Sequence, residues 1–397
     1  MKTELMSANY AAARTVVSAR VEVVAAYPIT PATTVPEQIA LLNEKGIFKG
    51  EFIRVESEHS AIFACIGASS TGARAFTATS SNGLLLMDEG LHWAAAARLP
   101  IVVNNVNRSV SPSWNIHVSH DDAYSKRDTG WIQFYVSSVD EVYHTIIQSF
   151  KLAEDERVLM PVMVNADGFV LSHTLSSFDY LEPEEVDKFL PPYTPPHWVM
   201  DPENPISHGN MVFPEVGPNL PGYQEFRYGM HEGTLNALKV YEEVEKEYKK
   251  LFGKYFGGPI DCHKCDDAEV VFTSQGSMGA EAKDAVDELR EEGYKIGNAR
   301  IRMIRPFPTD KIRELGSRVK AFASFDRGVS YGFGGPVAND IRSTMYHTKH
   351  RPIIKSYIGG LGGRDMTVQD IKTVILDTFT ALESGELGPE ETWHDLR

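Results

Sequence analysis

The strongest constraint on the fold is a regular alternation of short β-rich runs with helical stretches along the first half of the chain. The runs are rich in Val, Ile, Phe and Thr, and the stretches between them carry apolar residues at helical spacing. The predicted strands are residues 21–26, 73–79, 100–106, 131–136 and 158–164, and the predicted helices are residues 36–43, 60–70, 84–97 and 141–154. Alternation of this kind predicts a parallel, doubly wound α/β sheet.

A second block of the same pattern occupies the C-terminal third of the chain. Its predicted strands are residues 269–273, 295–303, 319–325 and 352–357. A stretch rich in Pro and Gly at 191–222 precedes it, followed by a charged segment at 239–252 whose Glu/Lys spacing is typical of a solvated helix face. With 397 residues available, we therefore expect two doubly wound α/β domains, at 1–230 and 266–397, joined by a helical linker at 231–265.

Charge and cysteine content narrow the function classes. The net charge of −15 argues against a nucleic-acid or anionic-membrane surface, because phosphate binding requires clustered Lys and Arg. The first residues include an acidic side chain and no long apolar run, so we expect a cytoplasmic chain without a membrane span. We expect Cys65 to be buried and reduced, and Cys262 and Cys265 to lie on a surface loop, because further metal ligands are lacking. No metal site is predicted.

Four segments at predicted strand ends carry polar side chains that suit a binding site. The first is YPITPATT at 27–34, in which Thr30 is a candidate carboxylate ligand; Thr33 or Thr34 as a helix cap is the simpler interpretation. The second is VESEHSA at 55–61, where Glu58 either complements a helix dipole or, if buried, shares a proton with a heterocyclic nitrogen. TATSSNG at 77–83 offers hydroxyls and backbone N–H groups to an anion or a polar cofactor edge.

The fourth segment begins at Arg108, directly after a predicted buried strand. Its guanidinium is suited to a carboxylate, although a surface salt bridge is also compatible with the sequence. The polar loop at 113–128 is expected to be a lid or a subunit contact rather than a metal site. QGSMG at 275–279 is expected to approach a phosphate or a neighbouring backbone, and GGLGGRD at 359–365 to make a close packing contact.

Taken together, the motifs match one family in order and context. They are YPITP at 27–31, VESEHSA at 55–61, TSSNGLLLM at 79–87, NRSVSPSWNIH at 107–117, RDTGWIQFY at 127–135, EDERVLMPVMV at 154–164, RPFP at 305–308 and GGLGGRD at 359–365. Over nearly its whole length the chain resembles the α subunit of pyruvate:ferredoxin oxidoreductases (pyruvate synthases), within the 2-oxoacid:ferredoxin oxidoreductase family. The resemblance implies a transketolase-like pyrimidine-binding domain followed by a transketolase C-terminal-like domain.

The resemblance also implies an activity and the residues that perform it. It implies the reversible oxidative decarboxylation of pyruvate to acetyl-coenzyme A and carbon dioxide, with thiamine diphosphate as cofactor and electrons passed to ferredoxin. Glu58 would contact N1′ of the thiamine aminopyrimidine, while Thr30 and Arg108 would hold the substrate carboxylate. The further expected cofactor contacts are Pro28, Ile29, Ser81 and Asn82.

Partner chains are implied by what the sequence lacks. The GDG motif with which this class binds the diphosphate and Mg²⁺ does not occur, and three cysteines are too few for iron–sulfur clusters. We therefore expect a β subunit with the diphosphate and Mg²⁺ site, γ and δ subunits with the iron–sulfur clusters, and coenzyme A as co-substrate. Trp114, near the expected acyl pocket, keeps a branched-chain or aryl 2-oxoacid open as substrate. A non-catalytic scaffold subunit and a non-redox thiamine enzyme also stay open as hypotheses.

Overall fold

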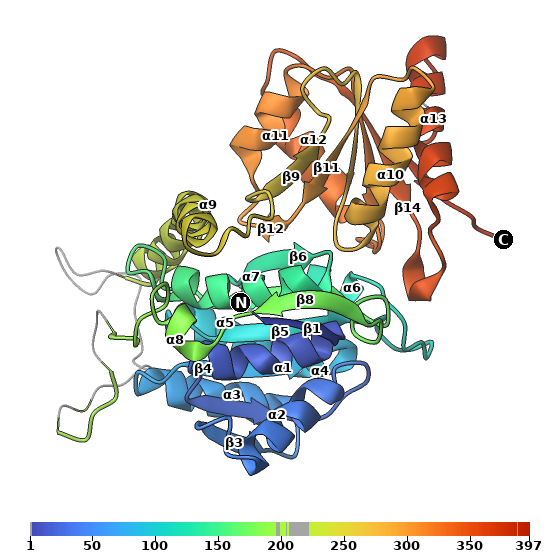
Figure 1. Ribbon diagram of the computed structural model, residues 1–397. Coiled ribbons are helices and arrows are strands. Elements are labelled where there is room, and N and C mark those ends of the chain that lie inside the picture. Colours follow the sequence, from blue (N-terminus) through green and yellow to red (C-terminus); the bar gives the residue numbers. More distant parts are fainter. Residues whose placement is uncertain (1, 196–198, 204, 206–221, 387) are drawn as a thin grey trace.

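A computed structural model describes residues 2–195, 199–203, 205, 222–386 and 388–397 of the chain. Figure 1 shows two α/β parts, one coloured blue to green and one gold to red, with the long helix α9 beside their junction. In chain order the elements are β1 (Lys2–Met6), α1 (Ala8–Ser18), β2 (Val23–Ala26), α2 (Thr34–Glu44), β3 (Glu51–Arg54), α3 (Glu58–Ser70), β4 (Ala75–Thr79), α4 (Ser81–Leu86), α5 (Asp88–Ala96), β5 (Val102–Asn107), α6 (Asp121–Tyr124), β6 (Ile132–Val136), α7 (Val139–Glu154), β7 (Val162–Asp167), β8 (Ser176–Tyr180), α8 (Pro183–Val186), α9 (Tyr223–Phe252), β9 (Ile260–His263), β10 (Val270–Ser274), α10 (Met278–Glu291), β11 (Ile296–Ile301), β12 (Met303–Arg305), α11 (Thr309–Gly316), β13 (Ala321–Asp326), α12 (Pro336–Met345), β14 (Ile353–Ile358), the 3₁₀ turn η1 (Leu361–Gly363), α13 (Val368–Ser384) and β15 (Glu391–Trp393).

The first part is built on a seven-stranded sheet with the order β12-β6-β7-β5-β4-β2-β3. Strands β2 to β7 pair in parallel, and β12 adds an antiparallel strand at the edge of β6. The chain runs outward from β2 to β3 and then returns to place β4 on the other side of β2. The strand order therefore reverses between β2 and β4, which is where open α/β sheets bind their ligands, beyond the carboxyl ends of the strands.

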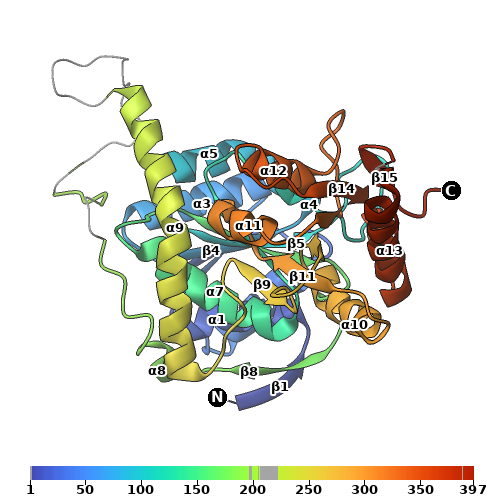
Figure 2. The ribbon, with the colours of Figure 1, turned by 90° about the horizontal axis from the view of Figure 1, so that it is seen from above.

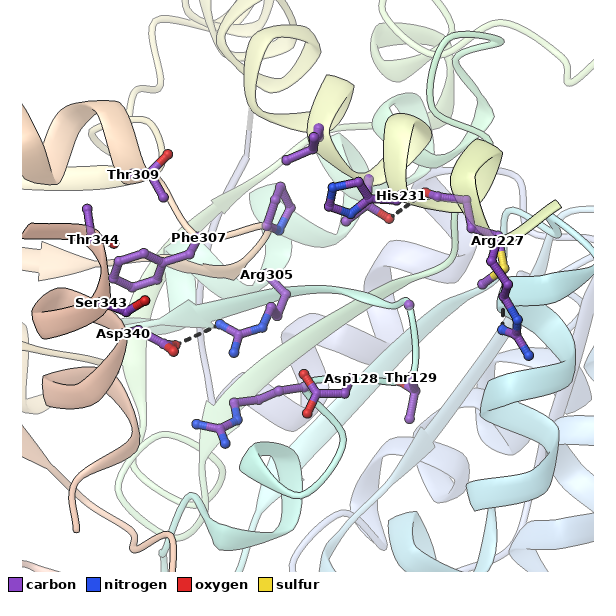
Figure 3. Close-up of a pocket in the computed structure, with 16 residues that line it drawn as sticks. Asp128, Thr129, Arg227, His231, Arg305, Phe307, Thr309, Asp340, Ser343 and Thr344 are labelled. Atoms are coloured by element: carbon purple, nitrogen blue, oxygen red, sulfur yellow. Dashed lines mark hydrogen bonds and ion pairs between the residues drawn. The ribbon is translucent and has the colours of Figure 1, made fainter. Parts of the chain in front are cut away.

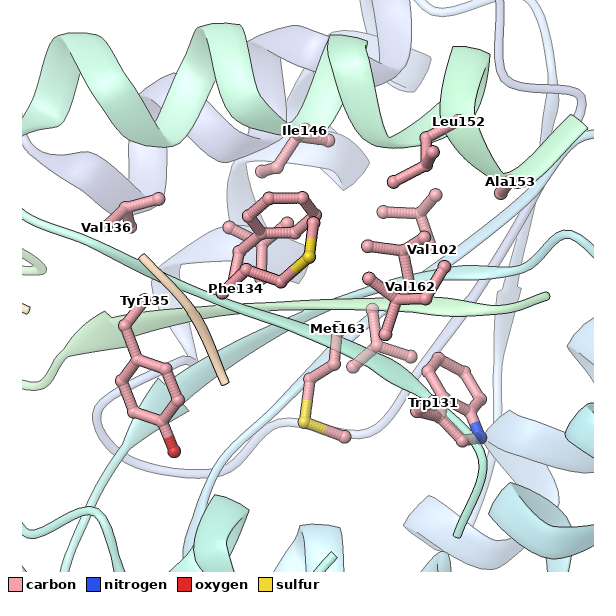
Figure 4. Packing of buried hydrophobic residues seen from close by; sticks show 14 of the residues in the cluster. Val102, Trp131, Phe134, Tyr135, Val136, Ile146, Leu152, Ala153, Val162 and Met163 are labelled. Atoms are coloured by element: carbon pink, nitrogen blue, oxygen red, sulfur yellow. The ribbon is translucent and has the colours of Figure 1, made fainter. Parts of the chain in front are cut away.

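Helices cover both faces of this sheet, as Figure 2 shows from above. Helices α1, α2 and α7 pack together on one face, whereas α3, α4 and α5 pack together on the other. Helix α9 runs along the side of the sheet and contacts both α5 and α7. Figure 4 shows the core beneath α7, where Phe134 and Val136 point toward Ile146 of the helix and Tyr135 points to the opposite face. All residues of β6 are buried, as expected for a parallel strand covered on both sides.

The second part is a six-stranded sheet with the order β15-β14-β13-β10-β11-β9. Only β9 is antiparallel, on the edge of β11. Helices α10 and α13 pack together, and so do α11 and α12. The carboxyl ends of β10 and β13 contact the carboxyl end of β7 and the helix α6, so the carboxyl edges of the two sheets meet at the junction. None of the described helices combines the length and apolar character that a membrane span requires.

The predicted fold class is confirmed, and each of the nine predicted strand regions overlaps a strand of the structure. Two helix predictions need correction. The predicted helix at 84–97 is two helices, α4 and α5, which meet at Met87. The segment at 239–252 belongs to the 30-residue α9, and one side of it is buried through Val240, Tyr241, Val244 and Tyr248, so it is not simply a solvated helix. The predicted domain boundaries stay predictions.

Candidate functional site

Glu58 lies at the start of α3, where the local sequence places it. The Ser57 side chain caps the helix by accepting a hydrogen bond from the Ser60 N–H at 3.2 Å, and Glu58 is the first helical residue. Its side chain points into the protein, because Glu58 is only 6% exposed. Burial raises the pKa of the Glu58 carboxyl above its ordinary value, while its own backbone N–H and the charge of Arg108 oppose the shift. Of the two interpretations of Glu58, the structure therefore shows the buried one.

The turn after β4 closes over Glu58. A Cβ atom placed on Gly83 would lie 2.5 Å from Glu58 Oε1 and 2.6 Å from Thr79 Oγ1, so the backbone of α4 touches the carboxyl group. Ser81, at the start of α4, has a φ of 49°, in the left-handed region that non-glycine residues seldom adopt. The Ser81 hydroxyl donates to the Ser109 carbonyl at 2.6 Å. Asn82 Oδ1 accepts a hydrogen bond from the Ser111 N–H at 3.1 Å, so this turn is attached to the loop after β5.

Arg108, immediately after β5, connects this turn to the loop after β2. It is 7% exposed, and its Nη1 donates a hydrogen bond of 2.8 Å to the Thr30 carbonyl. Burial lowers the pKa of the Arg108 guanidinium, and the nearby carboxylates of Asp122 and Glu58 counteract this shift. Among the described residues no carboxylate forms an ion pair with Arg108, so the surface-salt-bridge interpretation does not apply. Glu58, Arg108 and Thr30 thus lie around one point at the carboxyl edge of the sheet.

Asn9 of α1 stabilises the loop between β2 and α2 by hydrogen bonds. Asn9 Nδ2 donates to the Pro31 carbonyl at 2.7 Å and to Thr34 Oγ1 at 2.8 Å. Thr33 occupies the N-cap position of α2, but its side chain forms no capping hydrogen bond. Thr30 is exposed, and its hydroxyl has no hydrogen-bond partner among the described residues. Pro28 is likewise exposed and Ile29 half-buried, so this loop presents its side chains outward beside Arg108.

Asp122, which sequence reasoning placed only in a polar loop, is a central residue of this arrangement. It is fully buried and accepts hydrogen bonds from the Ser81 and Arg108 N–H groups, both at 3.1 Å. Its other donors are Asn105 Nδ2, Asn107 Nδ2 and the Ala123 N–H. Burial raises the pKa of the Asp122 carboxyl, and these hydrogen bonds oppose the shift. Its role depends on contacts between distant segments, so no local sequence signal indicated it.

Three buried hydroxyl groups on β4 or directly after it have no partner among the described residues. They are Thr77 Oγ1, Thr79 Oγ1 and Ser80 Oγ, of which Thr79 Oγ1 lies beside Gly83 together with the Glu58 carboxyl. Apart from its own backbone N–H, the Glu58 carboxyl also has no hydrogen-bond partner there. Unsatisfied buried polar groups have free hydrogen-bonding capacity that a bound molecule or water can use. A polar heterocycle that needs a carboxyl partner therefore fits the residues at this end of the sheet.

The polar loop at 113–128 and the QGSMG segment meet at the junction of the two parts. Buried Asp167, the last residue of β7, accepts hydrogen bonds from Ser277 Oγ at 2.6 Å and Arg327 Nη1 at 3.1 Å. His120 Nε2 lies 2.7 Å from the other carboxylate oxygen. The pKa of Asp167 is well below its ordinary value because His120, Arg327 and Ser277 outweigh the effect of burial. Much of the loop therefore joins the two parts of one chain, which corrects the lid or subunit-contact prediction for residues 119–124.

Other predictions from glycine and cysteine positions have mixed outcomes. The GGLGG segment makes the predicted close contact, because the Gly362 carbonyl accepts a hydrogen bond from Asn115 and a Cβ on Gly363 would clash with His117. Trp114 is 83% exposed on the same loop, so it narrows no pocket within this chain. Cys65 is buried and free, as predicted. Cys262 is exposed but lies on the edge strand β9, and Cys265 is buried, so the surface-loop prediction is wrong for this pair.

A cavity of about 570 Å³ lies away from Glu58, between α9, α12 and the segment after β12. Figure 3 shows Arg305 reaching Asp340 in this cavity, with Phe307 and His231 along its walls. The Arg305 Nη1 to Asp340 Oδ2 distance is 2.8 Å. None of the site residues predicted from the sequence lines this cavity. Among the described residues, no group of three or more His, Cys, Asp or Glu side chains is suited to hold a metal ion.

Comparison with known proteins assigns the chain to a family. The family described as pyruvate flavodoxin/ferredoxin oxidoreductase, thiamine diphosphate-binding, matches residues 14–246, and pyruvate:ferredoxin oxidoreductase core domain II matches residues 268–371. The chain belongs to the pyruvate flavodoxin/ferredoxin oxidoreductase family. Within this family it is 45% identical to ketoisovalerate oxidoreductase subunit VorA of Pyrococcus horikoshii, over 99% of this chain and 98% of that one. It is 43% identical to pyruvate synthase subunit PorA of Pyrococcus abyssi, with the same coverage.

Two solved structures confirm the fold of this chain. The 2-oxoglutarate:ferredoxin oxidoreductase from Magnetococcus marinus, solved with 2-oxoglutarate, coenzyme A and succinyl-CoA, matches with a TM-score of 0.72 at 22% identity over 94% of this chain. The match spans 65% of that longer chain. A split-gene transketolase, as an inactive β4 tetramer, matches with a TM-score of 0.54 at 11% identity, covering 94% of this chain and 98% of that one. The transketolase-like architecture predicted from the motifs is therefore confirmed.

Proposed function

We propose that this chain is the α subunit of a thiamine-diphosphate-dependent 2-oxoacid:ferredoxin oxidoreductase that converts pyruvate and coenzyme A reversibly to acetyl-coenzyme A and carbon dioxide. The observation that carries the proposal is the buried Glu58 carboxyl, which lies beside Gly83 and Arg108 without a side-chain hydrogen-bond partner among the described residues. Membership of a thiamine diphosphate-binding family and relatives named as 2-oxoacid oxidoreductase subunits support it.

Glu58 is proposed to hold a proton at the cofactor. Thiamine diphosphate supplies the electron sink that decarboxylation of a 2-oxoacid needs. A buried carboxyl with a raised pKa is suited to share a proton between its Oε1 and a heterocyclic nitrogen, which on this chain would be N1′ of the aminopyrimidine. Pro28, Ile29, Ser81 and Asn82, on the loops to either side, are the proposed further contacts to the cofactor.

Arg108 and Thr30 are proposed to hold the substrate carboxylate. Arg108 uses Nη1 for the Thr30 carbonyl, so its other guanidinium N–H groups remain available. The exposed Thr30 side chain provides a hydroxyl next to it. Because the Arg108 guanidinium is buried, water contacts it poorly. A bound carboxylate would accept hydrogen bonds from its free N–H groups, and the resulting ion pair would orient the 2-oxo carbon toward the cofactor.

The remaining parts of the reaction are proposed to lie on partner chains. Mg²⁺ and the diphosphate would be bound by a β subunit, and the iron–sulfur clusters by γ and δ subunits that pass electrons to ferredoxin. Two features support this division: both close relatives are named as subunits, and no metal-binding cluster occurs among the described residues of this chain. Coenzyme A, present in the Magnetococcus marinus structure, would enter as co-substrate.

A branched-chain 2-oxoacid is the second candidate substrate. The relative named for ketoisovalerate is 45% identical to this chain and the relative named for pyruvate is 43% identical, so identity does not separate them. Trp114 is 83% exposed and therefore does not by itself favour either substrate. Kinetic measurements on pyruvate and on ketoisovalerate distinguish the two candidates.

The proposed function is tested on the complex purified without oxygen, with the tagged chain as bait. We expect iron and thiamine diphosphate in the complex and dye reduction that requires both pyruvate and coenzyme A. Glu58→Gln should lower kcat by about 100-fold or more, because general acid–base catalysis contributes roughly that factor. Glu56→Gln is the matched control, because Glu56 lies two residues away but is exposed. A complex with full activity after Glu58→Gln would support a non-catalytic scaffold role, and activity only on ketoisovalerate would replace the substrate.

A further inference from the structure

Asp122 joins two turns that lie far apart in the sequence. Its Oδ2 accepts hydrogen bonds from the Ser81 N–H and from the Arg108 N–H, both at 3.1 Å. The same oxygen accepts from Asn105 Nδ2 at 3.3 Å, and Oδ1 accepts from Asn107 Nδ2 at 2.8 Å. Asp122 itself lies on the short helix α6, so three separate segments converge on one carboxylate.

Each of the two turns carries one wall of the candidate site. The turn that begins at Ser81 continues to Gly83, whose backbone lies against the Glu58 carboxyl. The turn at Arg108 supplies the guanidinium that lies near Glu58 and donates to the Thr30 carbonyl. Two hydrogen bonds outside Asp122, from the Ser81 hydroxyl to the Ser109 carbonyl and from the Ser111 N–H to Asn82, also join the turns, but only the bonds to Asp122 hold the Arg108 backbone itself against the wall that contacts Glu58. Neither turn is otherwise stabilised by a repeating backbone ladder, because both lie beyond the last paired residues of their strands.

A carboxylate is the group that this position requires. All the hydrogen bonds that the Asp122 carboxylate accepts come from N–H groups, and the side chain is completely buried. An asparagine side chain would place its NH₂ group against N–H donors in either orientation of the amide. One orientation sets the NH₂ group against the Ser81 and Arg108 N–H groups and the other sets it against the Ala123 N–H, and because all three are backbone donors neither orientation leaves the network intact.

We propose that Asp122 is a positioning residue that sets the distance between Glu58 and the substrate-binding guanidinium of Arg108, by holding the Ser81 and Arg108 turns together. This inference rests on the proposed function of Glu58 and Arg108. Asp122 touches neither substrate nor cofactor in this scheme; it acts through the backbone of the residues that do. Loss of its carboxylate should therefore weaken use of the 2-oxoacid more than use of coenzyme A.

The test compares Asp122→Asn with Asp121→Asn in the assembled complex. Asp121 is the matched control, because its carboxylate bonds the Val329 N–H and Ser119 instead of the two turns. Hydrogen exchange should accelerate about tenfold or more at the amides of Ser81 and Arg108 in Asp122→Asn, and at neither in Asp121→Asn. The kcat/KM for the 2-oxoacid should fall about tenfold or more, while the KM for coenzyme A changes less than about twofold. If Asp122→Asn fails to fold, Asn107→Ala removes one donor and should give a smaller effect of the same kind.

Unchanged exchange at the two amides would overturn the proposal, whether or not the enzyme is active. Accelerated exchange with unaltered kinetics for the 2-oxoacid would also overturn it, because Asp122 would then be structural only. A parallel rise in the KM values of the 2-oxoacid and coenzyme A would count against a positioning role in the same way. If the wild-type complex uses no 2-oxoacid, the proposed function fails separately, and Asp122 has no substrate-binding residue to position.

Discussion

At the scale of single residues, the absence of a side chain at Gly83 is what allows the turn after β4 to contact Glu58. Gly83→Ala would place a methyl group 2.5 Å from Glu58 Oε1, which is closer than such atoms approach, so the flexible carboxylate must move. Alanine itself suits a helix, so we expect the chain to fold. We predict a fall in kcat of about tenfold or more, measured as pyruvate-dependent dye reduction by the complex.

Gly67→Ala is the control for this substitution. Gly67 lies within α3, the helix that begins at Glu58, and a Cβ atom there would meet nothing within 4 Å. It should leave kcat unchanged and raise the free energy of unfolding by up to about 1 kcal/mol through helix propensity. If Gly83→Ala and Gly67→Ala have equal kcat, the contact between Gly83 and the Glu58 carboxyl is not needed for catalysis.

At the scale of elements, the beginning of α3 determines the orientation of Glu58. Ser57→Ala removes the hydroxyl that accepts the Ser60 N–H, and such caps contribute about 1 kcal/mol. We predict a loss of about 1 kcal/mol in the free energy of unfolding, measured by urea titration, together with a reduced kcat. Ser57→Asp keeps an acceptor at the cap and should retain most of the stability. A Ser57→Ala chain as stable as wild type would show that packing alone positions the helix.

The elements also show what the sequence could predict. Buried parallel strands such as β5 and β7 were predictable, because the apolar runs at 100–103 and 158–164, which lead into them, are a local signal. The strand β12 was not, since its three residues pair with β6 through a contact between distant segments. The break at Met87 was also unpredictable, because neither Gly nor Pro occurs there. In the same way Thr30 and Arg108 follow recognisable strands and Glu58 begins a recognisable helix, so the local sequence indicated these residues. Asp122 contacts the segments around residues 81 and 108 only in the folded chain, so the local sequence did not indicate its role.

At the scale of the whole molecule, a buried cluster of charges connects the two α/β parts and α9. Arg302 of the second part donates to Glu141 Oε1 at 2.5 Å and to Glu245 Oε1 of α9 at 3.0 Å. Arg300 also donates to Glu141, and these charges lower the pKa of Glu141 to about 2 despite its burial. The cluster thus joins α7, α9 and the segment at 300–302, which are distant from one another in the sequence.

We predict that Arg302→Leu lowers the free energy of unfolding by about 3–5 kcal/mol, because it leaves buried Glu245 without its ion-pair partner and Glu141 with Arg300 alone. Arg313→Leu is the control, since Arg313 forms an exposed ion pair with Asp310 and should cost less than about 1 kcal/mol. Chemical unfolding of both variants provides the measurement. If the two variants lose equal stability, the cluster does not hold the parts together.

The junction also contains a carboxyl group whose ionisation opposes folding. Asp326, at the end of β13, is fully buried and accepts hydrogen bonds from the Val337 and Ala338 N–H groups, and it lies 3.2 Å from the Tyr124 hydroxyl of the first part. Burial raises the pKa of Asp326 to about 6. The Tyr124 hydroxyl also donates to Gln275 Oε1 at 2.6 Å, so its single hydrogen cannot fully serve an ionised Asp326 as well.

A carboxyl whose pKa is higher in the folded than in the unfolded chain stabilises the fold at low pH, and this contribution is lost as the pH rises through the folded value. For Asp326 the window runs from about pH 4 to about pH 6, and the shift corresponds to about 3 kcal/mol. We therefore predict that wild type loses about 2 kcal/mol relative to Asp326→Asn between pH 4 and pH 7, measured by urea unfolding. Because Glu141 titrates at lower pH in both proteins, its contribution cancels from this difference. A difference that stays constant with pH would mean that Asp326 ionises in the folded chain at its ordinary pKa.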